Sequence, residues 1–273
     1  MFFPIRDYRR SRSTPIVTIA IIALNLAVFV VQMFFLGGDA TQYGINPQET
    51  LRGYQCAPLS QRDLFIFEYG VTPCELFGNC GETRICDFEA NRVATVDGPF
   101  PESAMPPWLT IFTAMFVHGG LLHIGGNMWF LWIFGDNVED RMGRGRFLLF
   151  YLVTGLAAAA AQIVSDPSSS TPMVGASGAV AGVLGAYLML YPHGRVLTLM
   201  WIVWFVQFIE LPAIIVLGMW IVLQVVQALI GQGMLSGGGV AYLAHIGGFL
   251  AGMALVKVFA RPDPPTVTYS GWR

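Results

Sequence analysis

Long uncharged blocks divide this sequence, and they restrict its fold more than any other feature. The first block, residues 16–36, runs for 21 residues without a charged side chain, and a helix needs about 20 apolar residues to cross a bilayer. Further blocks occupy residues 111–135, 147–165, 174–191 and 196–256, the last with Glu210 as its only acid. Charged residues make up 12% of the chain, against roughly 25% in soluble domains. The sequence therefore predicts an all-α membrane protein with several transmembrane helices.

The last block is too long for one span, and Pro212 and a glycine cluster at 231–239 divide it. These breakers predict a re-entrant or strand-like piece at about 196–209, a helix at about 211–230 and a last helix at about 241–259. The total is six spans, with five or seven as alternatives. The predicted order is a cytoplasmic N-terminus (1–15), a first transmembrane helix (16–36), an external loop (37–107), a core with five further spans (108–259) and a cytoplasmic tail (260–273).

The basic residues predict the orientation, because short cytoplasmic loops are enriched in Lys and Arg. Apart from the long loop at 37–107, they gather in alternate connections: Arg6, Arg9, Arg10 and Arg12 before the first span, Arg141, Arg144 and Arg146 after the second, Arg195 after the fourth, and Lys257, Arg261 and Arg273 at the end. The connections at 165–172 and 231–239 contain neither Lys nor Arg. This alternation predicts that both termini lie in the cytoplasm.

The predicted external loop contains all four cysteines: Cys56, Cys74, Cys80 and Cys86. Disulfides persist outside the cytoplasm, so we expect two of them, with three pairings open. A metal site is the alternative, but the spacers between Cys74, Cys80 and Cys86 are longer than those of usual zinc sites. The compact chain and this external loop predict the plasma membrane of a prokaryote. The sequence carries no nucleic-acid-binding signature, so lipid and membrane proteins are the expected partners.

Polar side chains inside a span are costly and are candidate functional residues. The candidates are His118, His123, Asn127, Ser177, Glu210, Gln224, Gln227 and His245. Ser177 lies in Gly-Ala-Ser-Gly (175–178), at the start of a predicted span. The N–H groups and dipole of a helix N-terminus favour a developing anion, and Gly175 lets a substrate carbonyl come close. Helix packing through small residues such as Gly178 is the alternative.

His245 lies near the start of the last predicted span. Small residues follow at helical spacing on two faces: Gly248 and Gly252 on the face of His245, and Ala181 and Gly185 on the face of Ser177. Such stripes allow helices to approach closely. If the two stripes face each other, the imidazole of His245 lies beside the Ser177 hydroxyl, as a base beside its nucleophile. A histidine that serves only a helix contact is the alternative.

A third motif contains His118, His123 and Asn127. His123 and Asn127 are four residues apart and share a helix face, and both side chains can donate hydrogen bonds to an oxyanion. His118 lies about 140° around the helix from His123, at the mouth of the span. Polar contact between helices is the alternative role for this motif.

In the predicted topology, the second, fourth and sixth spans all enter from the outside, so the three motifs share the outer half of the bilayer. A water-filled cavity open to the outside follows, because hydrolysis needs water at that depth. No Asp or Glu lies at that depth, so we predict a Ser–His dyad of Ser177 and His245. Packing or a backbone carbonyl would take the orienting role that a carboxylate usually has.

Together, His-x4-His-x3-Asn, Gly-x-Ser-Gly and Ala-His-x-x-Gly-x3-Gly make the sequence resemble the rhomboid family of intramembrane serine proteases over about residues 108–256. The resemblance implies a bundle of six transmembrane helices and cleavage of single-span or polytopic membrane proteins without a cofactor or metal. It implies Ser177 as nucleophile and His245 as base. It also implies an oxyanion hole formed by His123, Asn127 and the backbone N–H of Ser177.

Two positions depart from the common rhomboid pattern. A Trp-Arg pair of the first external loop is replaced by Trp108-Leu109, and an aromatic residue one turn after the nucleophile is replaced by Ala181. Neither change removes a reacting group. Three rival functions fit less well: a client-binding protein would have a broken dyad, a transporter would show an inverted repeat, and a histidine metal site would need ligands on one helix face. We therefore expect a serine endopeptidase.

Overall fold

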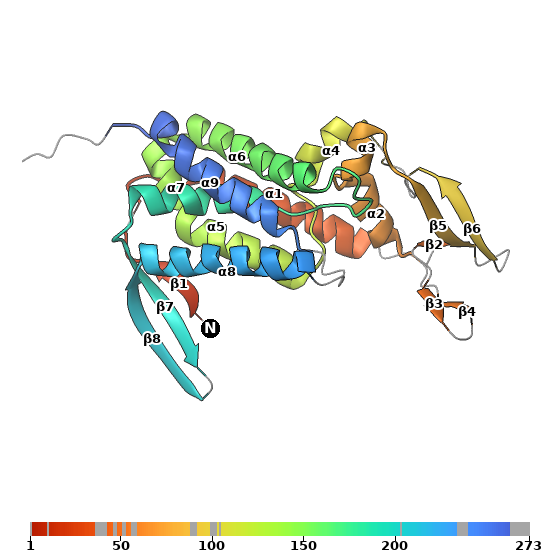
Figure 1. Ribbon diagram of the computed structural model, residues 1–273. Coiled ribbons are helices and arrows are strands. Elements are labelled where there is room, and N and C mark those ends of the chain that lie inside the picture. Colours follow the sequence, from red (N-terminus) through yellow and green to blue (C-terminus); the bar gives the residue numbers. More distant parts are fainter. Residues whose placement is uncertain are drawn as a thin grey trace, which may run out of the picture.

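A bundle of long helices with roughly parallel axes forms the centre of the protein (Figure 1). The computed structural model describes residues 2–9, 11–35, 43–45, 48–50, 53–55, 59–87, 92–98, 103, 105–202, 204–233 and 240–262. Within these residues, the long helices are α1 (Ile16–Val30, continued by a π-helical turn at Val31–Phe35), α5 (Leu121–Met142), α6 (Arg144–Ser165), α7 (Ser177–Leu190), α8 (Ala213–Gly233) and α9 (Tyr242–Phe259).

Four of these helices, α1, α6, α8 and α9, are long and apolar enough to cross a bilayer. Large apolar side chains such as Leu24, Leu149, Val222 and Leu250 are exposed on their outer surfaces, where lipid can cover them. The chain is therefore a multi-pass helical membrane protein, as predicted. Helix α7 is apolar but has only 14 residues, and α5 ends in a charged segment. The count of six spans stays a prediction.

Helix α7 lies at the centre of the core. Ten of its residues are buried, from Gly178 to Tyr187, and it packs against α5, α6, α8 and α9. The largest fully buried apolar side chains around it come from α5, α6, α7 and α8: Leu131, Phe134, Met142, Phe147, Phe150, Tyr151, Leu184, Tyr187 and Leu217. The helix that begins at Ser177 is thus held inside the bundle, while Ser177 itself is half-buried.

A carboxylate of α5 fixes the start of α1. The backbone N–H groups of Val17 and Thr18 donate hydrogen bonds of 3.0 and 2.8 Å to Glu139, and the Thr18 hydroxyl donates another of 2.8 Å. A negative charge at a helix N-terminus satisfies free N–H groups and is favoured by the helix dipole. This contact joins α1 to the C-terminal half of α5. The N-terminal half of α5 is not involved in it.

A three-stranded antiparallel sheet lies at one end of the bundle (Figure 1). It contains β1 (Phe2–Asp7), β7 (Arg195–Ile202) and β8 (Phe205–Pro212) in the order β1-β7-β8. The hairpin β7-β8 connects α7 to α8, and its strands pair from Arg195 with Pro212 to Ile202 with Phe205. Of the two alternatives left open for residues 196–209, a re-entrant piece or a strand, the structure contains the strand.

The predicted external loop carries short helices and strands at the other end of the bundle (Figure 1). They are β2 (Tyr43–Ile45), β3 (Gln48–Thr50), β4 (Gly53–Gln55), α2 (Gln61–Tyr69), α3 (Pro73–Phe77), β5 (Glu82–Asp87) and β6 (Arg92–Asp97), and α4 (Pro107–Thr113) begins where the predicted loop ends. Helix α2 begins with a reciprocal capping box, in which Ser60 and Asp63 bond each other's backbone N–H groups. Helix α3 ends at Gly78, whose φ of 62° favours glycine.

Candidate active site

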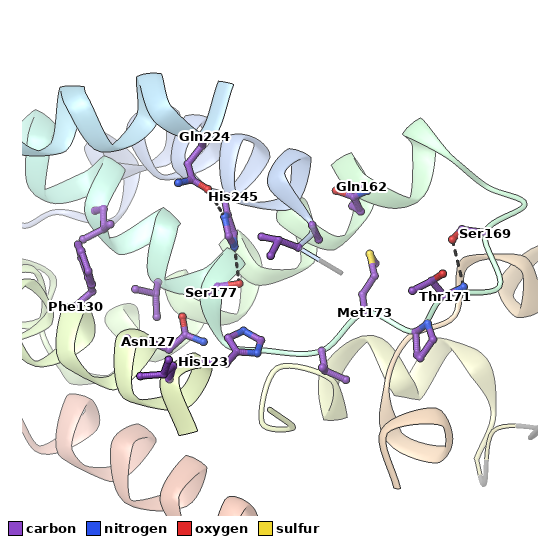
Figure 2. A pocket seen from close by; sticks show the side chains of 18 of the residues that line it. His123, Asn127, Phe130, Gln162, Ser169, Thr171, Met173, Ser177, Gln224 and His245 are labelled. Atoms are coloured by element: carbon purple, nitrogen blue, oxygen red, sulfur yellow. Dashed lines mark hydrogen bonds between the residues drawn. The ribbon is translucent and has the colours of Figure 1, made fainter. Parts of the chain in front are cut away.

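Ser177 and His245 are in direct contact. Ser177 is the first residue of α7, and His245 lies in the first turn of α9. The Nε2 atom of His245 is 2.8 Å from the Oγ atom of Ser177 (Figure 2). This is the distance expected between a nucleophile and the base that takes its proton. The structure thus brings together two residues that are 68 positions apart in the sequence.

The contact depends on glycines that let α7 and α9 pack backbone to backbone. A Cβ atom at Gly248 would collide with the carbonyl oxygen of Gly178, and one at Gly252 would collide with that of Gly182. Gly178 also faces α6, where a Cβ would come within 2.5 Å of the Ala158 side chain. The predicted stripe of Gly248 and Gly252 therefore packs against Gly178 and Gly182, which were not in the stripe predicted for α7, while Gly185 of that stripe meets the backbone of Phe249. The close approach of the two helices brings His245 to Ser177.

The turn before Ser177 requires glycine at position 175. Gly175 has a φ of 122°, a conformation that other residues rarely adopt. A Cβ atom there would lie 2.6 Å from Nε2 of His123. The Gly175 N–H donates a 2.7 Å hydrogen bond to the carbonyl oxygen of Ala114. The backbone before Ser177 is thus fixed against the segment between α4 and α5.

The side chain of His118 binds the backbone of this turn. Its side chain is fully buried, and its Nε2 atom accepts a 3.4 Å hydrogen bond from the N–H of Ala176. Its Nδ1 atom is 3.3 Å from the carbonyl oxygen of Phe116. A neutral imidazole has one donor and one acceptor nitrogen, so Nδ1 donates and Nε2 accepts. His118 therefore holds backbone next to Ser177, and both of its ring nitrogens already have protein partners.

His123 and Asn127 present N–H groups beside Ser177 (Figure 2). The Nδ1 atom of His123 accepts a 3.4 Å hydrogen bond from the N–H of Gly119, so the neutral ring carries its proton on Nε2. The side-chain nitrogen of Asn127 is buried and has no hydrogen-bond partner in the described part of the structure. As the first residue of α7, Ser177 has a backbone N–H with no partner within the helix. Three donors therefore surround the position next to the Ser177 hydroxyl.

A cavity of about 640 Å³ opens onto these residues. It lies where α5, α7 and α9 begin, and the beginnings of all three helices line it, together with α8 and residues 166–174. Its apolar wall includes Phe130 and Trp220, whose ring centroids are 6.4 Å apart. Among the described residues, no three His, Cys, Asp or Glu side chains are grouped so that they could hold a metal ion.

The family model of the Rhomboid domain matches residues 106–262. That segment is more than half of the chain and includes Ser177, His245 and the three donors. This chain belongs to the rhomboid family. Its helical core is accordingly the rhomboid domain, preceded by α1 and the cysteine-containing segment.

Three relatives illustrate the breadth of this similarity. The chain is 39% identical to the rhomboid protease GluP of Bacillus subtilis over 92 residues, which are 34% of this chain and 18% of GluP. It is 30% identical to the chloroplastic Rhomboid-like protein 11 of Arabidopsis thaliana over 164 residues, 57% of this chain and 54% of the relative. It is 29% identical to the mitochondrial Rhomboid protein 1 of Saccharomyces cerevisiae over 150 residues, 53% of this chain and 40% of the relative. The chain thus spans about half or less of the length of these relatives.

One residue of the site in this rhomboid was named as a polar candidate in the sequence, but no role was predicted for it. The Oε1 atom of Gln224, on α8, is 2.7 Å from Nδ1 of His245 (Figure 2). We expected packing or a backbone carbonyl to orient the imidazole, and the structure has a side-chain amide in that position instead. The signal in the sequence was a glutamine within an uncharged apolar block; in the structure Gln224 is buried, while its neighbours Leu223 and Val225 are exposed. A polar side chain that faces inward from a span marks a functional site.

The two departures from the common rhomboid pattern have different surroundings. Ala181 is fully buried one turn after Ser177, so no aromatic ring reaches His245 from α7. Rings from other positions flank the imidazole instead: Trp220 and Tyr242 lie 6.0 and 6.4 Å from it, centroid to centroid. Trp108, at the start of α4, is exposed.

The cysteine-containing segment is connected to the loop that leads to Ser177. Cys74 and Cys80 form a disulfide, as predicted for this segment. Cys56 and the side chain of Cys86 lie outside the described residues, so the second disulfide stays a prediction. Val71 and Met173 exchange two backbone hydrogen bonds of 3.0 and 2.9 Å. The element that holds the disulfide thus packs against one side of the entrance to this rhomboid site.

Proposed function

We propose that this rhomboid is an intramembrane serine endopeptidase that cleaves transmembrane protein substrates. One observation carries the proposal: the Ser177 hydroxyl lies 2.8 Å from the imidazole of His245. The side-chain nitrogen of Asn127, which has no hydrogen-bond partner among the described residues, supports it from the same cavity. A buried donor without a partner is costly in a protein. It is explained if its partner is an oxyanion that forms during the reaction.

The first half of the reaction would produce an acyl-enzyme. His245 Nε2 takes the proton as Ser177 Oγ attacks the carbonyl carbon of the scissile peptide bond. The negative charge on the resulting tetrahedral oxygen is stabilised by N–H groups of His123, Asn127 and the Ser177 backbone. His245 then returns the proton to the leaving amine, and the peptide bond breaks.

The second half would use water from the cavity. His245 Nε2 takes a proton from the water as its oxygen attacks the acyl carbon, and the same donors stabilise the second oxyanion. The ester bond to Ser177 then breaks, and the serine oxygen regains a proton from His245. Every proton in this cycle is transferred by residues of the chain, so the proposal needs no cofactor.

The membrane context is part of the same proposal. The six helices span the plasma membrane of a prokaryote, with both termini in the cytoplasm, because the arginine-rich connections lie at the end opposite the cavity. The cavity then opens toward the outside. Substrates are single-span or polytopic membrane proteins that are cut near the outer face of the bilayer.

A cleavage assay with a matched variant tests the proposal. The purified protein, in detergent and again in lipid vesicles, is incubated with a single-span substrate whose fragments are identified by mass spectrometry. We expect a peptide-bond cut in the outer part of the substrate span, and no cut by Ser177→Ala at equal melting temperature. Cleavage by Ser177→Ala would refute the mechanism. A folded wild type that binds the substrate without cutting it would instead favour the non-proteolytic client-binding function.

A further inference from the structure

The imidazole of His245 has a side-chain partner at each nitrogen. Nε2 faces Ser177 Oγ at 2.8 Å, and Nδ1 faces Gln224 Oε1 at 2.7 Å. The three residues come from three different helices, α7, α8 and α9. Figure 2 shows them in line across the cavity wall, with both hydrogen bonds drawn. Gln224 is 9% exposed, so little water competes for its carbonyl oxygen.

This arrangement determines which nitrogen of His245 carries the proton. The amide oxygen of Gln224 can only accept a hydrogen bond, so Nδ1 of the imidazole must be the donor. In the neutral ring, Nε2 then presents its lone pair to the Ser177 hydroxyl. Only this tautomer can act as the general base for Ser177, because the other would place a proton between Nε2 and Oγ.

We propose that Gln224 is the positioning residue of this site, the third member of a Ser177–His245–Gln224 triad. The inference rests on the proposed peptidase function. An amide suits the location, because an ionised carboxylate would be costly to bury in a span. Gln224 also restrains rotation of the His245 ring. It thereby orients the ring in place of the aromatic side chain that Ala181 replaces.

Two substitutions of Gln224 distinguish the effect of its hydrogen-bond acceptor from the effect of its side-chain volume. Gln224→Leu removes the acceptor at similar volume. It should lower kcat by about 10²-fold with little change in KM, which is within the roughly 10²–10⁴-fold that general base catalysis contributes. Gln224→Glu keeps an acceptor and should rescue most of this loss. Because a carboxylate stabilises the protonated ring, the rising limb of its pH–rate profile should move to higher pH. The matched control is Gln227→Leu, which changes an exposed glutamine on the same helix and should act like the wild type.

A measurement without turnover separates this inference from the proposed function. In Ser177→Ala, ¹⁵N NMR of selectively labelled histidine should place the His245 proton on Nδ1, and adding Gln224→Leu should change its tautomer populations. Unchanged tautomer populations would overturn the inference even if the protein is a peptidase. Wild-type kcat in Gln224→Leu, or a Gln224→Glu variant as slow as Gln224→Leu, would also overturn it. If the wild type cleaves nothing while these NMR results hold, the positioning contact stands and the proposed function fails.

Discussion

The hydroxyl of Tyr187 donates a 2.5 Å hydrogen bond to the carboxylate of Asp7, and so joins the central helix α7 to the N-terminal strand β1. The side-chain nitrogen of Asn137 donates a second bond of 3.0 Å to the same carboxylate. Burial raises the pKa of Asp7 to about 6, against the opposing hydrogen bond from Tyr187 and with a further contribution from Asp136. The folded protein therefore favours protonated Asp7 more than the unfolded chain does.

This shift predicts a loss of stability as the pH rises. An acid whose folded pKa is raised contributes stability below its unfolded pKa, near 3.8, and loses it as the pH passes its folded pKa, about 6. Asp7→Asn stays neutral, so the difference in melting temperature between variant and wild type should grow in favour of the variant from about pH 4 to about pH 6. Melting temperatures in detergent across that range measure it. Parallel curves for the two proteins would contradict the account.

The glycine contact between α7 and α9 predicts that one methyl group weakens the bundle. Gly248→Ala places a Cβ against the carbonyl oxygen of Gly178, and overpacking of this kind costs about 1–3 kcal/mol. Because the same contact delivers His245 to Ser177, cleavage should fall as well. The matched control is Gly218→Ala on α8, where a Cβ meets no atom within 4 Å. Thermal melting and cleavage rates test the pair, and equal behaviour of the two variants would count against close packing at Gly248.

The proposed oxyanion donors predict slow but folded variants. His123→Ala and Asn127→Ala should each lower kcat by about 10²–10³-fold, the usual loss for one donor. Asn127→Ala should leave the melting temperature unchanged or raise it, because it removes a buried amide nitrogen that has no partner in the described structure. Steady-state cleavage and thermal melting measure these effects. Wild-type turnover in both variants would return the two residues to a packing role.

The disulfide between Cys74 and Cys80 predicts that reductant weakens the cysteine-containing segment. A cross-link that closes so short a loop stabilises a protein by about 2 kcal/mol in the chain-entropy model. The double variant Cys74→Ser/Cys80→Ser should therefore melt at a lower temperature than the oxidised wild type. Thiol labelling of intact membranes should modify these two cysteines only after reduction. Labelling of both without reductant would show that the disulfide does not form in the membrane.

The helical pattern and the contact between Ser177 and His245 could be predicted because each follows from local sequence. Uncharged length and the breakers Pro212 and 231–239 placed the last two helices within a few residues of α8 and α9. The small residues that follow Ser177 and His245 at helical spacing indicated the close contact between their helices. Both signals depend on the period of the helix and on the cost of polar groups in lipid.

The other features depend on partners that are distant in the sequence. Gln224 meets His245 only because α8 packs beside α9, and spacing along one helix cannot reveal which helix lies next to it. The pairing of β1 with β7 joins residues about 190 positions apart. Nothing in the local sequence of either strand indicates which strand it pairs with. Glu139 likewise caps a helix more than 120 residues before it. Such contacts are set by tertiary packing.

The most direct test of the central claim is covalent labelling of Ser177. A fluorophosphonate is incubated with the folded wild type, Ser177→Ala and His245→Ala, and the site of modification is determined by mass spectrometry. The account predicts one adduct, on Ser177 of the wild type, and none in either variant at equal melting temperature, because Ser177 is a weak nucleophile without its base. An adduct that forms equally fast in His245→Ala, or an unlabelled Ser177 in the folded wild type, would contradict it.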